Sequence, residues 1–238
     1  MIRKVVRHLS DKKGTLSKSE NLDWIRNHSS GIDEFANDLD PVLWEEAREY
    51  GKILQGRAEM VLREIEYKLG GGGAYHFLYF LTRYMKPDNI VETGVAAGYS
   101  THSFLSAMRK NKKGKLFSSD FPYFRLPNPE EYIGVLVEED LRIDWELYVD
   151  GDTSNLPRIL ERIEKIDLFH YDSDKSYSGR EFAVSHVEKR MSRDAVIVID
   201  DIQDNSHFHD YVKAREGPSW SVFEFEGKYI GLIGRLAK

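Results

Sequence analysis

The 238-residue chain contains no cysteine. This absence excludes disulfides, zinc–thiolate sites, iron–sulfur clusters and cysteine nucleophiles, and it fits a protein of the reducing cytosol. Long apolar runs are also missing, since none approaches the roughly 20 residues that a transmembrane helix needs. The apolar residues of the N-terminal segment MIRKVVRHLSDKKG are too few and too interrupted for a signal peptide. The sequence therefore predicts a cytoplasmic protein with no membrane partner.

Positive charge is outnumbered as well. The chain has 34 Lys and Arg against 40 Asp and Glu, which gives a net charge of -6. Such a surface does not favour a polyanion, so nucleic acid is not expected as a partner. The 41% of hydrophobic residues is enough to build the core of one α/β domain with an extension.

The first third of the sequence reads as helical. Residues 1 to about 32 are polar and predict a loose arm or a short helix. Asp40 and Pro41 are typical of a helix start, and apolar residues then recur at steps of three and four up to Leu69. The four glycines 70–73 break this helix, either as a plain joint or as the hinge of a lid. We divide the chain into an extension, 1–73, for lid or dimer contacts, and a domain, 74–238.

The domain begins with a helix over 75–85 and then alternates between two patterns. We expect strands at 90–93, 115–119, 145–149, 166–171 and 195–199, and helices at 100–109, 130–138, 156–163 and 178–191. Such alternation favours a parallel sheet covered by helices on both faces. Segments 221–225 and 229–236 are joined by a short link, so they form a hairpin with one antiparallel strand. The prediction is a Rossmann-like α/β fold of about seven strands.

The turn after the first strand of the sheet reads E-T-G-V-A-A-G, from Glu92 to Gly98. Glycines allow positive φ and a close approach of the backbone to a ligand. The dinucleotide fingerprint G-x-G-x-x-G has a middle glycine that is missing here. A cofactor without a pyrophosphate would not need it. The alternative is a plain strand-to-helix turn that leads into Ser100 and its helix.

Acidic residues follow the next two strands. Asp120 ends the second strand, where a carboxylate can accept hydrogen bonds from both hydroxyls of a ribose. Gly151 and Asp152 follow the third strand, where Asp152 can accept from an adenine amino group. Ligands of open α/β sheets bind at these carboxyl ends of the strands. The alternative for Asp120 is a helix cap or a solvated loop acid. The alternative for Asp152 is an Asp-Gly turn in which Asp152 caps the helix that begins near Leu156.

Three further carboxylates follow the fourth and fifth strands. Asp172 comes after 166–171, and Asp200 and Asp201 come after 195–199. Converging carboxylates repel one another unless they are paired or bind a cation. Oxygen-rich groups of this kind suit Mg²⁺ or another hard divalent cation. The alternative is that Asp200 and Asp201 are strand-end acids, one of which caps a helix.

In this order the motifs resemble class I S-adenosylmethionine-dependent methyltransferases, whose first motif is E-x-G-x-x-x-G. The resemblance implies that the turn wraps the amino-acid end of S-adenosylmethionine. The residues implied in cofactor binding are Glu92, Gly94, Gly98, Ser100, Asp120, Gly151, Asp152 and Asp172.

Two shorter segments are similar to metal-dependent O-methyltransferases. The segment YDSDKSY resembles the caffeoyl-CoA type, and VIDD resembles the macrocin type of sugar O-methyltransferase. The match implies Asp172, Asp200 and Asp201 as ligands of Mg²⁺ or another divalent cation. Lys175 lies three residues after the first ligand, where catechol-type enzymes have a lysine that acts as the base. The shorter loop before Tyr177 and the Asp-Asp pair depart from that pattern.

Histidines offer another candidate base, because the unperturbed pKa of histidine is near neutrality. His207 lies in the loop after the acidic pair and is the alternative to Lys175. His170 alternates with Phe169 and Tyr171 on a strand, which favours a core histidine.

The resulting hypothesis is a methyltransferase that modifies a hydroxyl of a small molecule, such as a sugar or a phenol, with divalent-metal assistance. The aromatic residues of the extension and of 121–140, such as Trp44 and Phe121, would either build the acceptor pocket or pack a core or dimer interface. The resemblance also implies a homo-oligomer formed through the N-terminal helices. The rival functions are a Rossmann-type NAD(P)-dependent oxidoreductase and a non-catalytic methyltransferase-like binding module.

Overall fold

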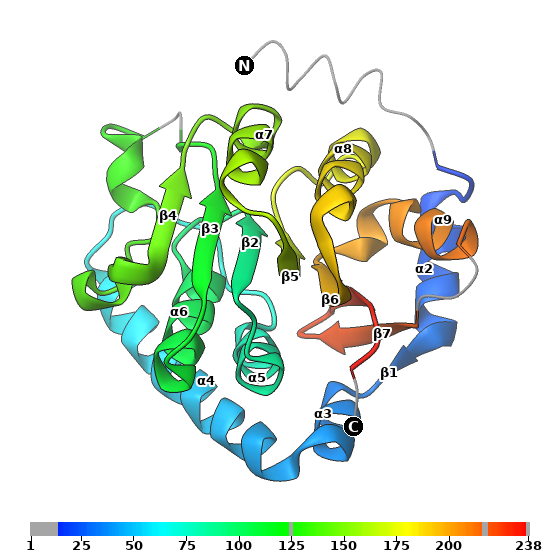
Figure 1. Ribbon diagram of the computed structural model, residues 1–238, viewed down its shortest axis with the longest axis horizontal. Coiled ribbons are helices and arrows are strands. Elements are labelled where there is room, and N and C mark those ends of the chain that lie inside the picture. Colours follow the sequence, from blue (N-terminus) through cyan, green and yellow to red (C-terminus); the bar gives the residue numbers. More distant parts are fainter. Residues whose placement is uncertain (1–13, 124–125, 216–218, 237–238) are drawn as a thin grey trace.

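The computed structural model describes residues 14–123, 126–215 and 219–236. Its N-terminal part is a series of helices that wrap one side of the molecule (Figure 1). Ser17 and Glu20 form a capping box at the start of the first of them, α2. Asp40 caps α4 by accepting a hydrogen bond from Leu43 N at 2.9 Å, with Pro41 in the first turn, as the sequence predicts. The helices are α2 (Lys18–His28), α3 (Ile32–Leu39), α4 (Pro41–Arg63) and α5 (Tyr75–Met85).

The rest of the chain alternates between strands and helices as expected. The strands are β1 (Ser29–Ser30), β2 (Asn89–Thr93), β3 (Lys115–Ser119), β4 (Trp145–Tyr148), β5 (Ile166–Tyr171), β6 (Met191–Ile199), β7 (Trp220–Phe225) and β8 (Lys228–Ile233). The remaining helices are α6 (Tyr99–Asn111), α7 (Asp152–Arg162), α8 (Tyr177–Val187) and α9 (His207–Lys213), with short 3₁₀ turns η1 (Pro129–Tyr132), η2 (Glu139–Asp144), η3 (Glu188–Arg190) and η4 (Ile202–Asp204).

Three of the predicted helices differ in the structure. The helix predicted to end at Met191, α8, ends at Val187, because β6 already begins at Met191. The helix expected over 130–138 is wrong, because only the 3₁₀ turn η1 forms there and Gly134 then adopts a φ of +66°. A positive φ cannot continue a right-handed helix. The long helix ends at Arg63 rather than at Leu69.

The strands of the described residues form one sheet of eight, in the order β1-β7-β8-β6-β5-β2-β3-β4. The sheet exceeds the expected number because the short β1 pairs with β7. Strands β2 to β6 pair in parallel, whereas β8 runs antiparallel to both β6 and β7, as the hairpin predicts. Chain order reverses between β2 and β5, and ligands of such sheets bind at this point.

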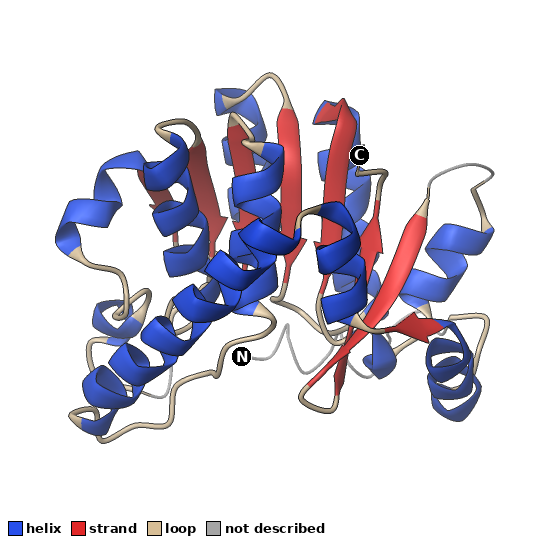
Figure 2. Ribbon diagram, turned by 90° about the horizontal axis from the view of Figure 1, so that it is seen from below, coloured by secondary structure: helices blue, strands red, loops and turns tan. Residues whose placement is uncertain are grey.

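Helices cover both faces of the sheet (Figure 2). Alternate residues of each strand enter two different cores, as the two-residue period of a strand requires. On β5, Leu168 packs with α3, α4, α5 and α6, while Phe169 packs on the other side with α2, α7, α8 and α9. Trp44 of α4 lies in the first core at 1% exposure, so α4 is anchored directly to the domain. Among the helices described, none is both long enough and apolar enough to span a bilayer.

Candidate functional site

The turn after β2 has the conformation that its glycines predict. Gly94 and Gly98 have φ of +84° and +102°, and Ala96 between them has +49°. A Cβ on Gly94 would lie 2.2 Å from the main-chain oxygen of Asp172, and a Cβ on Gly98 would lie 2.9 Å from Cα of Gly134. Glycine is therefore required at both positions, once for the end of β5 and once for the segment that follows η1.

Glu92, near the end of β2, points into the protein. Its carboxylate is completely buried and accepts hydrogen bonds from three hydroxyl groups, those of Ser100, Thr101 (2.7 Å) and Ser118 (2.8 Å). These bonds connect β2, α6 and β3. Glu92 and Ser100 thus hold the turn in place, and the Glu92 carboxylate is already occupied by protein groups.

Asp120 lies beside the turn. Its carboxylate accepts hydrogen bonds from the main-chain N–H groups of Val95 and Ala96, at 3.0 and 2.8 Å. Burial raises the pKa of Asp120, against the opposing effect of its main-chain donors. Asp120 at the end of β3 therefore lies against the glycine turn, and its role in binding ribose hydroxyls stays a prediction.

Asp152 joins the ends of three strands. It accepts hydrogen bonds from the hydroxyls of Ser119, at 2.7 Å, and Ser173. It is the first residue of α7, and Gly151 before it has a φ of +80°, with the ring of Phe121 at 3.2 Å from where its Cβ would be. Asp152 therefore connects Ser119 at the end of β3 with Ser173, which follows β5.

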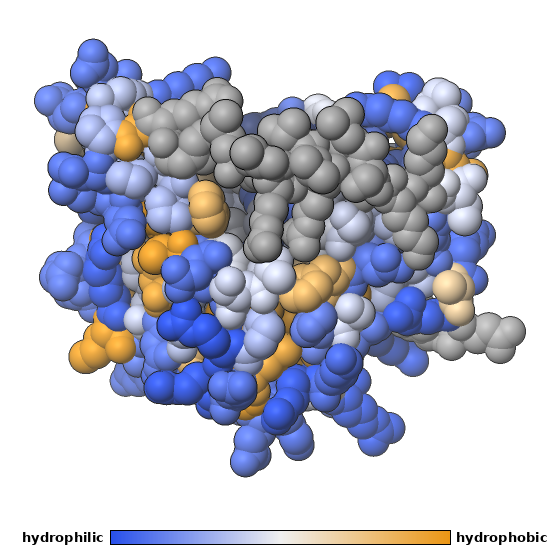
Figure 3. Space-filling view, turned by 90° about the horizontal axis from the view of Figure 1, so that it is seen from above, coloured by the Kyte–Doolittle hydropathy of each residue, from blue (hydrophilic) through white to orange (hydrophobic). Residues whose placement is uncertain are grey.

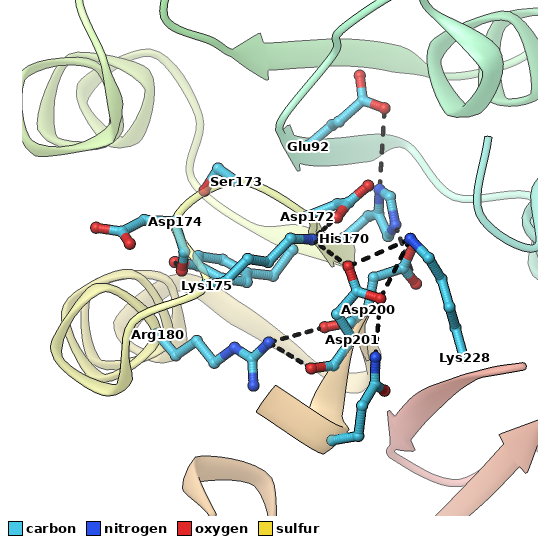
Figure 4. Close-up of polar contacts among 12 residues, drawn as sticks. Glu92, His170, Asp172, Ser173, Asp174, Lys175, Arg180, Asp200, Asp201 and Lys228 are labelled. Atoms are coloured by element: carbon cyan, nitrogen blue, oxygen red, sulfur yellow. Dashed lines mark hydrogen bonds and ion pairs between the residues drawn. The ribbon is translucent and has the colours of Figure 1, made fainter. Parts of the chain in front are cut away.

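Three carboxylates that follow β5 and β6 also come together and form an acidic centre, made of Asp172, Asp200 and Asp201 (Figure 4). Lys175 contacts Asp172 and lies 2.9 Å from Asp201 Oδ2. Lys228 Nζ lies 3.3 Å from Asp201 Oδ1. Burial and then the charge of Asp200 raise the pKa of Asp172 to about 6, although Lys175 opposes this rise.

The same contacts decide the charge of Lys175. Burial disfavours the ammonium, but Asp172 and Asp201 raise its pKa above the ordinary value for lysine. Burial likewise opposes ionisation of Asp201, yet Lys175 lowers the pKa of that carboxyl. Lys175 is therefore an ammonium in this arrangement, and an ammonium cannot accept a proton as a base.

His170 lies under this centre at 1% exposure. Its ring nitrogens are 3.9 Å from Glu92 Oε1 and 3.8 Å from Asp200 Oδ1, too long for hydrogen bonds, so the attraction is electrostatic. Burial disfavours the charged ring, but Asp200 and Glu92 together raise the pKa of His170 to about 10. His170 is a core histidine, as expected, and it is also the counter-charge of two buried carboxylates.

A small cleft opens beside the acidic centre. It is lined by Gly73, Asp200, Asp201, Phe225, Lys228 and Ile230. Its volume of about 10 Å³ is close to the minimum that one water molecule needs. The tetraglycine segment covers it, since a Cβ on Gly73 would lie 2.2 Å from Asp200 Oδ2.

In Figure 3, which looks onto the end of the molecule where β2, β3 and β4 finish, apolar patches lie among mainly hydrophilic residues.

A larger cavity of about 300 Å³ lies among α4, α5, α6 and η2, and it shares no lining residue with this cleft. Its charged groups pair with one another or with a neighbour: Arg109 with Asp140 at 2.7 Å, and Lys110 with Glu46 at 3.3 Å. The glycine turn and the strand-end acids lie elsewhere, so we place the functional site at the strand ends.

The acidic centre does not fit a divalent cation. Asp172 and Asp201 share Lys175, and Asp201 also faces Lys228. Within residues 14–123, 126–215 and 219–236, no group of three or more His, Cys, Asp or Glu side chains is arranged to hold a metal ion. The three aspartates meet as the sequence predicts, but protein cations already neutralise them.

Residues 91–202, from β2 to η4, match the family model of a methyltransferase domain. This segment of the chain is therefore similar to methyltransferase domains. The matched segment contains the glycine turn, Asp120, Asp152 and the acidic centre. The resemblance seen in the motifs is confirmed, and the match argues against the rival oxidoreductase.

Solved structures of methyltransferases share the fold of this chain. The O-methyltransferase TomG of Streptomyces achromogenes, involved in tomaymycin synthesis and solved with S-adenosylmethionine, has a TM-score of 0.60 at 18% identity, covering 76% of this chain and 88% of that chain. An O-methyltransferase of Bacillus cereus, solved with S-adenosylhomocysteine, has a TM-score of 0.56 at 17% identity, with 89% and 100% covered. A putative caffeoyl-CoA O-methyltransferase of Staphylococcus aureus has a TM-score of 0.58 at 12% identity, with 80% and 99% covered. No curated protein matches the chain in sequence.

The sequence patterns did not mark two residues that contact Asp200 or Asp201. Arg180 of α8 is fully buried and donates to the main-chain oxygens of Asp200 and Asp201, at 3.1 and 2.8 Å, which holds the turn after β6. Lys228 begins β8. An antiparallel strand begins where its neighbour ends, so the predicted hairpin contained the signal for Lys228. No local signal marks Arg180.

Other predicted residues lie away from the acidic centre. The ring of His207 packs 5.2 Å from the ring of Tyr177 and 6.2 Å from that of Tyr211, where α9 meets α8. Trp44 packs in the core. Phe121 is 57% exposed, and its ring lies beside Gly151. Of Trp44 and Phe121, Phe121 is therefore the residue that lies near the site, and Phe124, also expected there, lies outside the described residues.

Proposed function

We propose that this chain transfers a methyl group from S-adenosylmethionine to a hydroxyl of a small molecule. The observation that carries the proposal is the meeting of the glycine turn, Asp120 and the cleft beside Asp200 at one end of the sheet. Similarly folded proteins named as O-methyltransferases, two of them solved with S-adenosylmethionine or S-adenosylhomocysteine, support the choice of oxygen as acceptor.

The residues around the turn fit this cofactor. The turn from Gly94 to Gly98 would hold the amino-acid end of the cofactor, and Asp120 would accept hydrogen bonds from the ribose hydroxyls. Asp152 would face the adenine. The buried hydroxyl of Thr93, at the end of β2, lacks a hydrogen-bond partner among the described residues, which leaves a polar group for a ligand. When bound, the cofactor supplies a methyl group on a positively charged sulfur.

The chemistry needs a place for one proton. Methyl transfer forms a bond between the acceptor oxygen and the methyl carbon, breaks the carbon–sulfur bond with its electrons going to sulfur, and releases the hydroxyl proton. Asp200 lines the cleft and faces His170 at 3.8 Å, whereas two lysines share the charge of Asp201, so Asp200 is the better acceptor of that proton. Phe225 and Ile230 add apolar side chains to the lining of the cleft beside Asp200.

The implied homo-oligomer also has support. Val42, Ile53 and Met60 of α4 are 81%, 72% and 70% exposed. They are separated by eleven and seven residues, close to whole turns at about 3.6 residues per turn, so they share one face. An exposed apolar face of this kind suits contact with a second copy of the chain.

Calorimetric titration with S-adenosylhomocysteine tests the cofactor. We expect micromolar binding by the wild-type protein, weakened at least about tenfold in Asp120→Asn by the loss of a charged acceptor. Asp140→Asn, at an exposed aspartate paired with Arg109, is the matched control and should bind like the wild type. Failure of the wild type to bind would refute the proposal. Binding without methylation of any screened sugar or phenol would favour the binding module.

A further inference from the structure

The acidic centre contains its own cations. The Lys175 ammonium contacts Asp172 and lies 2.9 Å from Asp201, so it bridges the carboxylates that follow β5 and β6. Lys228 reaches the same Asp201 carboxylate from β8, at 3.3 Å. A lysine nitrogen thus lies between two of the three carboxylates that the motifs assigned to a divalent ion (Figure 4).

The backbone around Lys175 and Asp201 fixes this arrangement. The side-chain amide of Asn205 donates to the main-chain oxygen of Lys175 at 2.8 Å, which ties the β5 loop to the segment after β6. Arg180 donates to the main-chain oxygens of Asp200 and Asp201. Asp201 itself has a φ of +52°, a left-handed conformation that turns its side chain toward the lysines.

A divalent ion would compete with these cations. Two extra positive charges within a few Å of two ammonium groups are repelled strongly in a partly buried site. To release the carboxylates, Lys175 would have to leave a position in which it is only 32% exposed, and it would lose both partners.

We propose that Lys175 and Lys228 take the place of a divalent cation, and that Lys228 binds the acceptor oxygen at the cleft. This inference rests on the proposed function. Lys228 is 59% exposed and lines the cleft together with Asp200, so its ammonium is accessible to an oxygen that binds beside Asp200. Ammonium N–H groups stabilise the negative charge that develops on the oxygen. The lysines gain and lose no proton in this role, and the proton of the hydroxyl passes to Asp200.

The test measures the binding of Mn²⁺ to the protein. The electron paramagnetic resonance signal of the unbound ion reports how much Mn²⁺ remains free. Wild-type protein should bind Mn²⁺ only at millimolar concentrations. Lys175→Met and Lys228→Met each remove one positive charge and nearly preserve side-chain length. Each should tighten Mn²⁺ binding by at least about tenfold, because repulsion is relieved and Asp201 loses a partner. Adding Asp201→Asn to Lys175→Met should cancel the gain.

Lys110→Met is the matched control, because Lys110 lies 3.3 Å from Glu46 and is 56% exposed, close to the values for Lys228. It should leave Mn²⁺ binding unchanged. Micromolar Mn²⁺ binding by the wild type that is lost in Asp201→Asn would overturn the inference, as would the absence of any gain in both lysine variants. Lys228 is exposed, so its variant is expected to fold even if Lys175→Met does not. Titration of the same samples with S-adenosylhomocysteine tests the proposed function separately.

Discussion

His170 allows a sharp test of how the site is held together. The ring is 1% exposed and lies within 4 Å of one carboxylate oxygen of Glu92 and one of Asp200, at 3.9 and 3.8 Å. On its remaining side the ring of Phe104 packs edge-on, with centroids 5.7 Å apart. The substitution His170→Phe keeps an aromatic ring in this space and removes its charge. Two buried carboxylates then lose a shared counter-charge.

The magnitude follows from the pKa of His170, which burial lowers and which Asp200 and Glu92 together raise to about 10. An unfolded histidine has a pKa of about 6.5, and each unit of difference is worth about 1.4 kcal/mol, so the charged ring contributes about 5 kcal/mol. Because folding raises this pKa, the contribution is complete below pH about 6.5 and is lost as the pH rises through about 10. Near pH 6.5, His170→Phe should therefore lower the free energy of unfolding by about 3–5 kcal/mol.

Urea unfolding, followed by tryptophan fluorescence at several pH values between about 6.5 and 10, measures both the size and the pH dependence. The difference between wild type and His170→Phe should shrink as the pH rises. His186→Phe is the control, because the His186 ring bonds only a carbonyl of its own helix, at 2.7 Å. A difference that stays constant over this range would show that the ring acts by packing alone and would refute the electrostatic argument.

Two further predictions concern surfaces around the site. Gly73→Ala puts a methyl group 2.2 Å from Asp200 Oδ2, which should cost about 1–3 kcal/mol and lower the melting temperature by several degrees. Gly71→Ala is the control, because a Cβ on Gly71 has nothing within 4 Å. Equal effects of the two substitutions in thermal unfolding would contradict the close contact. If the chain pairs through α4, Ile53→Glu should reduce the mass measured by light scattering to that of a monomer. Ile143→Glu, at a position 84% exposed on η2, is the control and should leave that mass unchanged. A monomeric wild type would refute the pairing.

The amino-acid sequence by itself determined the composition of the site. Parallel strands finish at one edge of a sheet, so the residues that follow β2, β3, β5 and β6 had to meet once those strands were recognised. Asp120 beside the glycine turn, and Asp172 beside Asp200 and Asp201, follow from that argument alone. The missing middle glycine also separated this turn from a dinucleotide site, and the methyltransferase match agrees.

Only the tertiary structure decided how the charges are balanced. Strand order does not tell which way a side chain leaves a turn, so it could not place Lys175 between Asp172 and Asp201. Lys228 is more than 50 residues from Lys175, and only the antiparallel pairing of β8 with β6 brings it to the same carboxylate. Burial decided the role of Glu92, because a carboxylate enclosed between β2, α6 and β3 must take its hydrogen bonds from the protein. Local patterns specify which groups arrive at the site, whereas long-range packing specifies which of them neutralise one another.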